Sequence, residues 1–115
     1  MGEPRRRLRV SAAASADFAA ILQWTEQTFG RRQAQTYGDL LAATLGALLE
    51  GTDVAGSTPR DEILPGLRAL HMRRPGRHVV LYRVPEPDVV EVMRILHDAM
   101  DIERHLPRGE AGQET

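Results

Sequence analysis

The hydrophobic positions in the first half of the chain recur with the period of a helix. A short alternating stretch at residues 6–11 comes first and predicts a strand with one buried face. Apolar residues then follow at every third or fourth position, which predicts two amphipathic helices separated at Gly30. Ser15 is the expected N-cap of the first helix, with Asp17 in its first turn, and Gly51 is the expected end of the second. The predicted buried stripes are Phe18, Ile21, Leu22, Thr25 and Phe29, and then Ala34, Tyr37, Leu41, Leu45, Leu48 and Leu49.

In the second half of the chain the period changes to two, which is typical of strands. Residues 51–66 are rich in Gly, Pro, Ser, Thr and Asp and predict an exposed loop. Short turns containing proline then separate apolar stretches, so the stretches are expected to pair as an antiparallel meander. The predicted strands are 67–74, 77–84 and 89–97, with turns at 74–77 and 85–88.

These elements predict an α+β fold in a single domain over residues 1–106. Their order is β-α-α-β-β-β, and the simplest packing is a two-layer sandwich with the helical hairpin on one face of an antiparallel sheet. The first strand has to join this sheet, because a lone strand leaves its backbone groups unsatisfied. Residues 107–115 have no apolar pattern and are expected to form a disordered tail.

Strand alternation makes both faces of the last two strands largely apolar. Such strands lie centrally in a sheet or are covered on both sides, and in a chain this small the second cover is expected from a partner. Arg68, Arg83 and Arg94 are interleaved with these apolar positions, which favours a partner surface over an ordinary solvated face. On the last strand, the expected faces are Val90, Val92, Arg94 and Leu96 on one side, and Val89, Glu91, Met93, Ile95 and His97 on the other.

Composition narrows the possible chemistry. The chain has 115 residues and no cysteine, which excludes disulfides and a cysteine nucleophile, and a cytoplasmic location is expected. All 15 basic residues are arginine, so a lysine base is excluded. The net charge of −1 hides an uneven distribution: residues 60–84 carry six arginines and two acids, whereas residues 85–115 carry eight acids and three arginines. This asymmetry favours a basic surface that binds an acidic partner, either a protein or a nucleic acid.

Three catalytic or metal arrangements can be assembled from these residues. A metal-independent ribonuclease would use Arg83 and Arg94 as cations and a histidine as the base. The candidate bases are His71, His78, His97 and His105, of which His97 is selected with the two arginines. A metal site at His97, Asp101 and His105 would have at most three ligands from one helix, so no metal and no cofactor is expected. A triad built on Ser57 lacks any nucleophile elbow.

Several short motifs, taken in order, resemble the ParE toxins of bacterial toxin–antitoxin modules, within the RelE/ParE superfamily. They are Gly66-Leu67-Arg68, Tyr82-Arg83, Arg94-Ile95-Leu96-His97 and, a few residues later, Asp101, and these are called the signature residues below. The stretch TFGRRQAQTYGDLL is similar to the family's break between its two helices. The resemblance covers about residues 6 to 106.

The resemblance implies a cytoplasmic toxin that inhibits DNA gyrase and is neutralised by a ParD-like antitoxin in a hetero-oligomer. It implies neither a membrane nor sequence-specific nucleic-acid binding. The expected target contacts are Arg104 and His105. The expected antitoxin contacts are Leu41, Leu45, Leu48, Arg68, Arg83 and Arg94.

Two alternatives remain beside the gyrase inhibitor. One is a RelE-type, ribosome-dependent mRNA endonuclease, and the other is a member that binds its antitoxin without being toxic. The absence of lysine, and His97-Asp98 in place of the Arg and Tyr pattern of RelE-type nucleases, argue against the endonuclease. The long polar loop at 51–66 departs from the ParE pattern and bears on target choice and antitoxin pairing.

Overall fold

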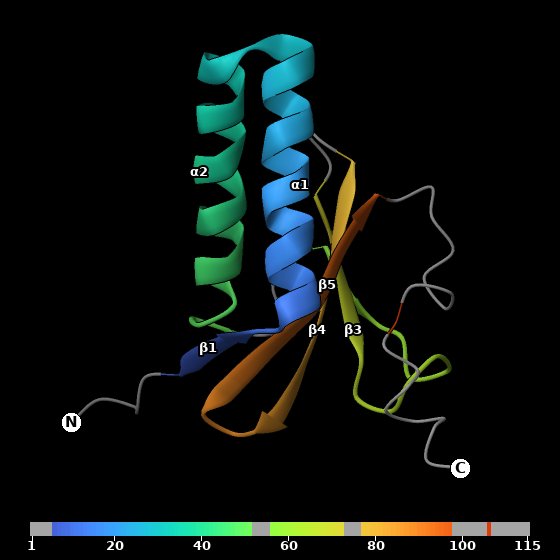
Figure 1. The fold of residues 1–115 in the computed structure, drawn as a ribbon. Coiled ribbons are helices and arrows are strands. Elements are labelled where there is room, and N and C mark those ends of the chain that lie inside the picture. The colour runs from blue at the N-terminus through green and yellow to red at the C-terminus, as the bar shows by residue number, and fades with distance from the viewer. Residues whose placement is uncertain (1–5, 52–55, 73–76, 98–105, 107–115) are drawn as a thin grey trace, which may run out of the picture.

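The computed structural model describes residues 6–51, 56–72, 77–97 and 106. A hairpin of two helices stands on one side of a sheet (Figure 1). In chain order the elements are β1 (Arg7–Val10), α1 (Ala12–Phe29), α2 (Arg31–Ala47), β2 (Ser57–Pro59), β3 (Arg68–Met72), β4 (His78–Glu86) and β5 (Val89–His97). The predicted α+β fold is therefore confirmed, and the last strand has the predicted bounds.

The sheet has five strands in the order β1-β5-β4-β3-β2. β3, β4 and β5 form the predicted antiparallel meander. β1 pairs with β5 in parallel, so the sheet is mixed and not purely antiparallel. β2 was not predicted: it lies within the polar stretch 51–66 and pairs antiparallel with β3 at the sheet edge. The predicted turn at 74–77 falls largely outside the described residues, and β4 continues to Glu86 through part of the other predicted turn.

The first helix begins four residues earlier than predicted. Its N-cap is Ser11, whose hydroxyl accepts a hydrogen bond from the Ala14 N–H at 2.9 Å and donates to the Met93 carbonyl at 2.8 Å. Ser15 instead lies inside the helix and is exposed. Ser11 was the better cap because one side chain both starts α1 and ties it to β5.

The two helices join at Gly30, as predicted. Gly30 has φ 101° and ψ 167°, a backbone region that is nearly restricted to glycine, and its N–H closes α1 on the Glu26 carbonyl at 2.9 Å. The second helix ends at Ala47 rather than at Gly51, and the chain leaves it through a turn in which the Gly51 N–H reaches the Ala47 carbonyl at 3.3 Å.

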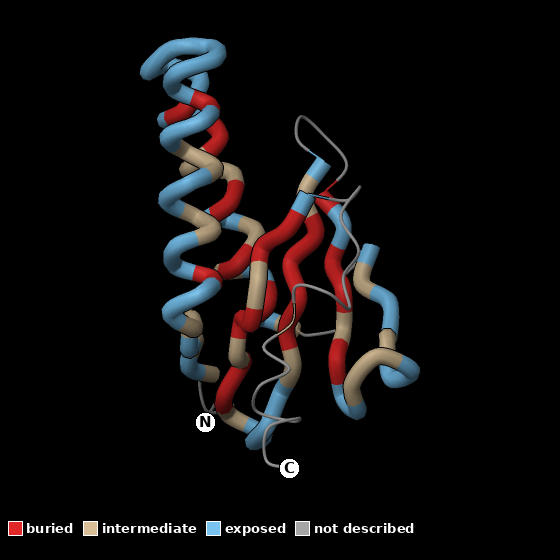
Figure 2. The backbone as a smooth tube through the Cα atoms, turned by 45° about the vertical axis from the view of Figure 1, so that its right-hand side comes forward, coloured by how far each residue is buried: buried red, intermediate tan, exposed pale blue. Residues whose placement is uncertain are grey.

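The main core lies between the hairpin and the sheet. Tyr37, Leu41, Leu45 and Leu48 of the predicted second stripe are buried there, and Leu49 is partly buried. One face of the inner strands β3, β4 and β5 completes this core, and burial is concentrated on these strands (Figure 2). Phe18 and Ile21 of α1 pack against this core, but Phe29 is exposed. No helix in the described part of the chain has the length and apolar character needed to cross a membrane.

A bulge at Met93 changes which β5 residues face the helices. Tyr82 pairs with Val92 and Leu81 pairs with Arg94, so Met93 has no partner on β4. As a result Ile95 joins Val90 and Val92 in the helix-facing core, whereas Leu96 joins Met93 on the outer face. The strict alternation predicted for this strand therefore holds through Met93 and is wrong beyond it, where Ile95 and Leu96 have exchanged faces.

The outer face of the sheet has a second, smaller core. It buries Leu67, Ala69, Val79, Leu81, Met93 and Leu96. Ile63, Leu64 and Leu106 of the same chain pack against it. The cover expected from a partner is therefore provided, at least in part, by the chain itself.

Candidate protein-binding site

Arg94 is engaged by α1 and is part of the fold. Its guanidinium donates to both carboxylate oxygens of Asp17, at 2.8 and 2.9 Å, and the pKa of Arg94 is raised chiefly by this hydrogen bond. The same carboxylate accepts the Ile95 N–H at 2.9 Å. β1 ends at Val10, so Asp17 provides an acceptor at the edge of β5 where the neighbouring strand has stopped. Asp17 was expected only to favour the first turn of the helix, and its actual partners come from 77 and 78 residues away.

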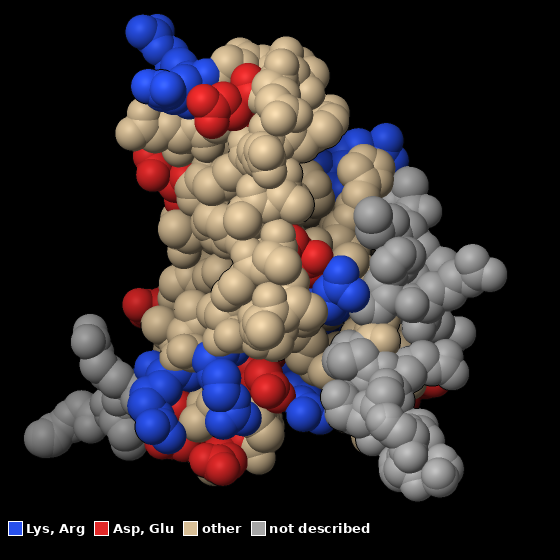
Figure 3. All heavy atoms as spheres, in the orientation of Figure 1, with Lys and Arg blue, Asp and Glu red and all other residues tan. Residues whose placement is uncertain are grey.

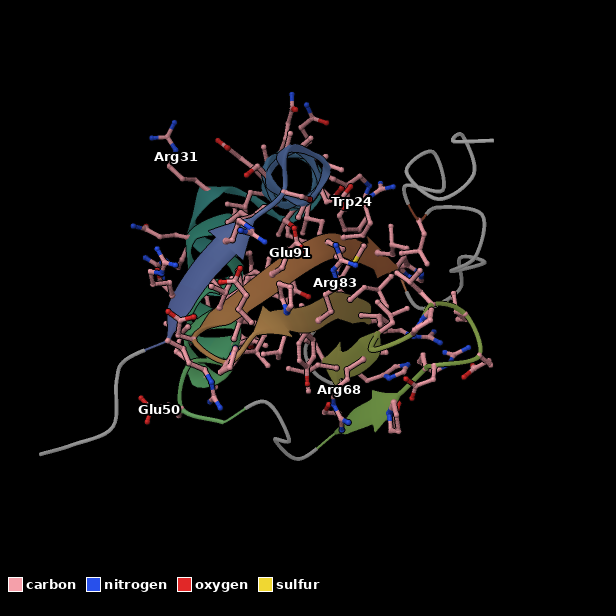
Figure 4. All side chains as sticks on the ribbon, turned by 90° about the horizontal axis from the view of Figure 1, so that it is seen from below. Trp24, Arg31, Glu50, Arg68, Arg83 and Glu91 are labelled. Carbon is pink, nitrogen blue, oxygen red and sulfur yellow. The ribbon has the colours of Figure 1, made fainter. Side chains whose placement is uncertain are left out.

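Arg83 is also paired within the chain. Its Nε donates to Glu91 at 2.8 Å, and Arg9 approaches the other oxygen of the same carboxylate at 3.5 Å. The three residues come from β4, β5 and β1, and Figure 4 shows Arg83 and Glu91 side by side on neighbouring strands. They form a charged row across the sheet.

Arg68 attaches the unpredicted edge strand to the sheet. Its Nε donates to the Ser57 hydroxyl at 2.9 Å, and that hydroxyl shares a 2.6 Å hydrogen bond with the buried Tyr82 hydroxyl. A buried phenol requires a partner of this kind. Arg68 and Tyr82 thus hold β2 in place.

The three leucines expected to bind the antitoxin are in the core. Leu41 and Leu48 are fully buried and Leu45 is nearly so, all against the chain's own sheet. They are core residues of the toxin itself. Their expected role as antitoxin contacts stays a prediction. The expected target contacts, Arg104 and His105, lie outside the described residues, as do Asp101 and the predicted tail.

The three candidate ribonuclease residues do not converge. His97 pairs with His78 across β4 and β5, and Arg83 lies five positions further along β4, about 17 Å away at the usual strand rise. Arg94 and Arg83 are both held by carboxylates. In the described ranges, no group of three His, Cys, Asp or Glu side chains is arranged to hold a metal ion.

A different set of side chains gathers at the end of β5. The Tyr37 hydroxyl and His78 Nδ1 share a hydrogen bond of 2.7 Å, and the rings of His78 and His97 meet edge to face with centroids 5.8 Å apart. Burial raises the pKa of the Tyr37 phenol, so it stays protonated near neutral pH. Sequence reasoning placed His97 at a strand end but did not connect it with Tyr37, because the two residues come from different layers.

An exposed aromatic pair lies beside these rings. Trp24 and Phe29 of α1 are 58% and 60% exposed and contact each other edge to face, with ring centroids 5.8 Å apart. Trp24 projects from α1 (Figure 4). Sequence reasoning missed Trp24; the available signal was a lone tryptophan outside the predicted apolar stripe of its helix.

Two open hollows lie at Trp24. One, of about 310 Å³, is lined by Trp24, Phe29, Thr36, Tyr37 and His78 among others. The other, of about 460 Å³, is lined by Trp24, Phe29, Ile21, Arg77, His78 and His97 among others. We call the two hollows together the Trp24 groove. The exposed surface of its walls is mostly apolar, an arrangement suited to binding. Its polar lining residues are Thr25, Gln33, Thr36, Tyr37, Arg77, His78 and His97.

Fold and site together define a small α+β domain with an exposed aromatic groove on a helical hairpin, which is a feature of proteins that bind other proteins. Residues 8–102 match the family model described as the ParE toxin of the type II toxin–antitoxin system, parDE. The chain belongs to this family of toxins.

Individual relatives of known family support the assignment to the ParE toxins. Toxin ParE1 of Mycobacterium tuberculosis (strain ATCC 25618 / H37Rv) is 35% identical over 105 residues, which cover 87% of this chain and 97% of the relative. Toxin ParE1 of Caulobacter vibrioides is 35% identical over 98 residues, covering 85% and 95%. A solved chain described as the chromosomal ParDE TA system from P. aeruginosa superposes with a TM-score of 0.69 at 20% identity, covering 81% of this chain and 96% of that one, and supports the fold.

Proposed function

We propose that this toxin inhibits DNA gyrase and is neutralised by a ParD-like antitoxin encoded beside it. The observation that carries the proposal is the match to the ParE toxin family over residues 8–102. Contacts within the fold agree with a toxin that acts by binding, because Arg83 and Arg94 are held in ion pairs and are not directed at a common point with His97.

The test is a supercoiling assay with purified gyrase and free toxin. The proposal expects supercoiling to stop and cleaved DNA to accumulate, and both effects to disappear when the antitoxin is added first. Leu41→Glu is the negative control, because a carboxylate at a fully buried position prevents folding. Unchanged gyrase activity at saturating, folded toxin would rule out gyrase as the target.

The RelE-type endonuclease is a second candidate, and the contact among Tyr37, His78 and His97 favours it. A phenol and two imidazoles within hydrogen-bond or ring contact can move protons during RNA cleavage. Primer extension on translated message is the test. New 5′ ends that disappear in His97→Ala, with gyrase unaffected, would establish this activity in place of gyrase inhibition.

A growth assay distinguishes gyrase inhibition and mRNA cleavage from the third possibility, a family member without toxicity. Induction of the toxin alone is expected to stop growth, and co-expression of the neighbouring antitoxin is expected to restore it. Normal growth on induction of soluble, folded toxin would identify a member that binds its antitoxin but has no target.

A further inference from the structure

Two exposed aromatic side chains set the Trp24 groove apart from the rest of the described surface. Among the described residues only Trp24, Phe29 and Val84 are large hydrophobics that remain exposed. Val84 lies on β4, whereas Trp24 and Phe29 contact each other and line both hollows. Exposed aromatic surface of this kind is buried in the interfaces of proteins that associate.

The outer face of α1 has the composition of a helix that is covered. α1 has only two charged side chains, Asp17 and Glu26, and both are paired within the chain, with Arg94 and Arg31. Its surface is largely uncharged between the charged groups at the hairpin tip and those around β1 (Figure 3). A helix on a solvated surface normally carries charged residues on its outer face. The partner that covers this face should be uncharged as well, because a charge buried there would have no counter-charge.

Short side chains and a large ring lie on the same face of α1. Ala13, Ala16, Ala20, Trp24 and Gln27 are exposed and recur at every third or fourth position, which is the spacing of a seam between two helices. Ala20 and Trp24 also line the same hollow. The short side chains lie towards the N-terminal end of the helix and the indole towards its C-terminal end. Two such faces therefore fit each other when the helices run antiparallel, with the ring of one over the alanines of the other.

We propose that this face of α1 binds the same face of a second copy of the chain, so that the free toxin forms a two-fold symmetric dimer. The two α1 helices run antiparallel and the two-fold axis passes at Ala20. Trp24 of each copy then packs against Ala16 of the other, because both residues lie one helical turn from Ala20, on opposite sides of it. A two-fold contact requires a surface that is complementary to itself. An uncharged face with its own projecting ring and its own hollow meets that requirement.

The first test measures the mass of the free, untagged toxin by analytical ultracentrifugation over a range of concentrations. The wild type is expected to shift from monomer to dimer as the concentration rises. Trp24→Ala is expected to raise the dimer Kd at least about tenfold, as for the loss of an interface anchor. Val84→Ala is the matched control, since it removes an exposed apolar side chain from β4, and should leave the Kd within about twofold. Thermal melts of the three monomeric proteins should coincide, because both side chains are exposed.

The second test determines the register of the two helices with introduced cysteines, since the chain has none of its own. Ala20→Cys places two thiols at the proposed axis and is expected to give a disulfide-linked dimer on mild oxidation. Gln27→Cys is the matched control because it is exposed on the same face. In the antiparallel dimer its two copies lie about 21 Å apart along the helices, at the usual helical rise. That separation is beyond the reach of a disulfide, so the control should stay unlinked.

These readouts involve neither gyrase nor antitoxin, so the dimer and the proposed function can fail separately. A wild type that stays monomeric at every concentration would overturn the dimer. Equal dimer affinities of wild type and Trp24→Ala would overturn its assignment to this face, and equal cross-linking of the two cysteine variants would overturn the antiparallel arrangement. A Trp24→Ala toxin that dimerises normally but binds antitoxin weakly would also overturn the assignment, since the groove would then serve the antitoxin.

Discussion

Arg94 was a candidate catalytic residue, but its contact with Asp17 shows that it stabilises the fold. The carboxylate completes the edge of β5 at the Ile95 N–H and holds the guanidinium with two further bonds. Tyr82, Arg83 and Arg68 are likewise engaged in contacts between strands. Most of the described signature residues therefore help to maintain the fold.

Replacing Asp17 should destabilise the toxin far more than replacing an exposed acid of the same helix. Asp17→Ala leaves the Ile95 N–H and the Arg94 guanidinium without this partly buried partner, which should lower the free energy of unfolding by about 2–3 kcal/mol. Glu26→Ala removes only the exposed pair with Arg31 and should cost less than about 0.5 kcal/mol. Urea unfolding followed by circular dichroism measures both. Equal losses in the two variants would mean that Asp17 is not a structural anchor.

Alkaline pH should lower the folding stability of the toxin through deprotonation of Tyr37 in the unfolded chain. Burial raises the pKa of this phenol above its ordinary value of 10.0, so above that pH the unfolded chain loses a proton that the folded chain keeps. Stability from this group is therefore complete below pH 10 and declines as the pH rises towards the folded pKa. Unfolding measured from pH 8 to 11 should fall more steeply in the wild type than in Tyr37→Phe. Parallel curves would contradict this origin.

At the scale of elements, the sequence predicted the features that depend on the local spacing of apolar residues. The buried stripe of α2, the break at Gly30 and the bounds of β5 follow from local spacing and were correct. The features that were predicted wrongly depend on contacts between residues far apart in the chain. Ser11 is chosen as the cap because it also bonds Met93, 82 residues away.

β2 and the bulge in β5 are further features that the local spacing of apolar and polar residues could not predict. The three residues of β2, of which Thr58 and Pro59 are exposed, form a strand because β3 offers an edge and because Ser57 bonds Tyr82 and Arg68. Neither feature is visible in the sequence of a polar loop. The bulge at Met93 carries no glycine or proline as a local signal. The Trp24 groove was missed for the same reason, since its walls come from α1, α2, β4 and β5.

The helical hairpin should depend on glycine at position 30. A Cβ there would meet no atom within 4 Å, so the cost of Gly30→Ala is that of the backbone angles alone, about 1–3 kcal/mol of unfolding free energy. Gly46→Ala is the matched control: it also meets nothing within 4 Å but lies in helical backbone within α2, and it should stabilise by about 0.5–1 kcal/mol. Thermal melts of the pair should shift in opposite directions. Shifts of the same sign would show that the backbone at Gly30 is not restrictive.

At the scale of the whole molecule, the buried core and the exposed aromatic side chains lie on different parts of the hairpin. The side of α2 that faces the sheet belongs to the main core, and the opposite face of the sheet is partly covered by Ile63, Leu64 and Leu106. The exposed end of α1 contributes little to either core, because Trp24 and Phe29 keep more than half of their surface in contact with solvent. Folding stability and dimer affinity should therefore respond to different substitutions.

Leu41→Ala and Trp24→Ala should separate these two properties. Leu41 is fully buried, so its truncation should lower the free energy of unfolding by about 2–5 kcal/mol. Because the folded molecules keep the Trp24 groove, the dimer Kd of this variant, corrected for the folded fraction, should stay within about twofold of the wild type. Trp24→Ala should show the reverse, with an unchanged melt of the monomer and a weakened dimer. Urea unfolding and analytical ultracentrifugation, measured on both variants, show whether stability and dimer affinity respond to different substitutions. If folded Leu41→Ala lost as much affinity as Trp24→Ala, the second copy would have to contact the helix at Leu41 after rearranging the core, and the separation between core and docking surface would be wrong.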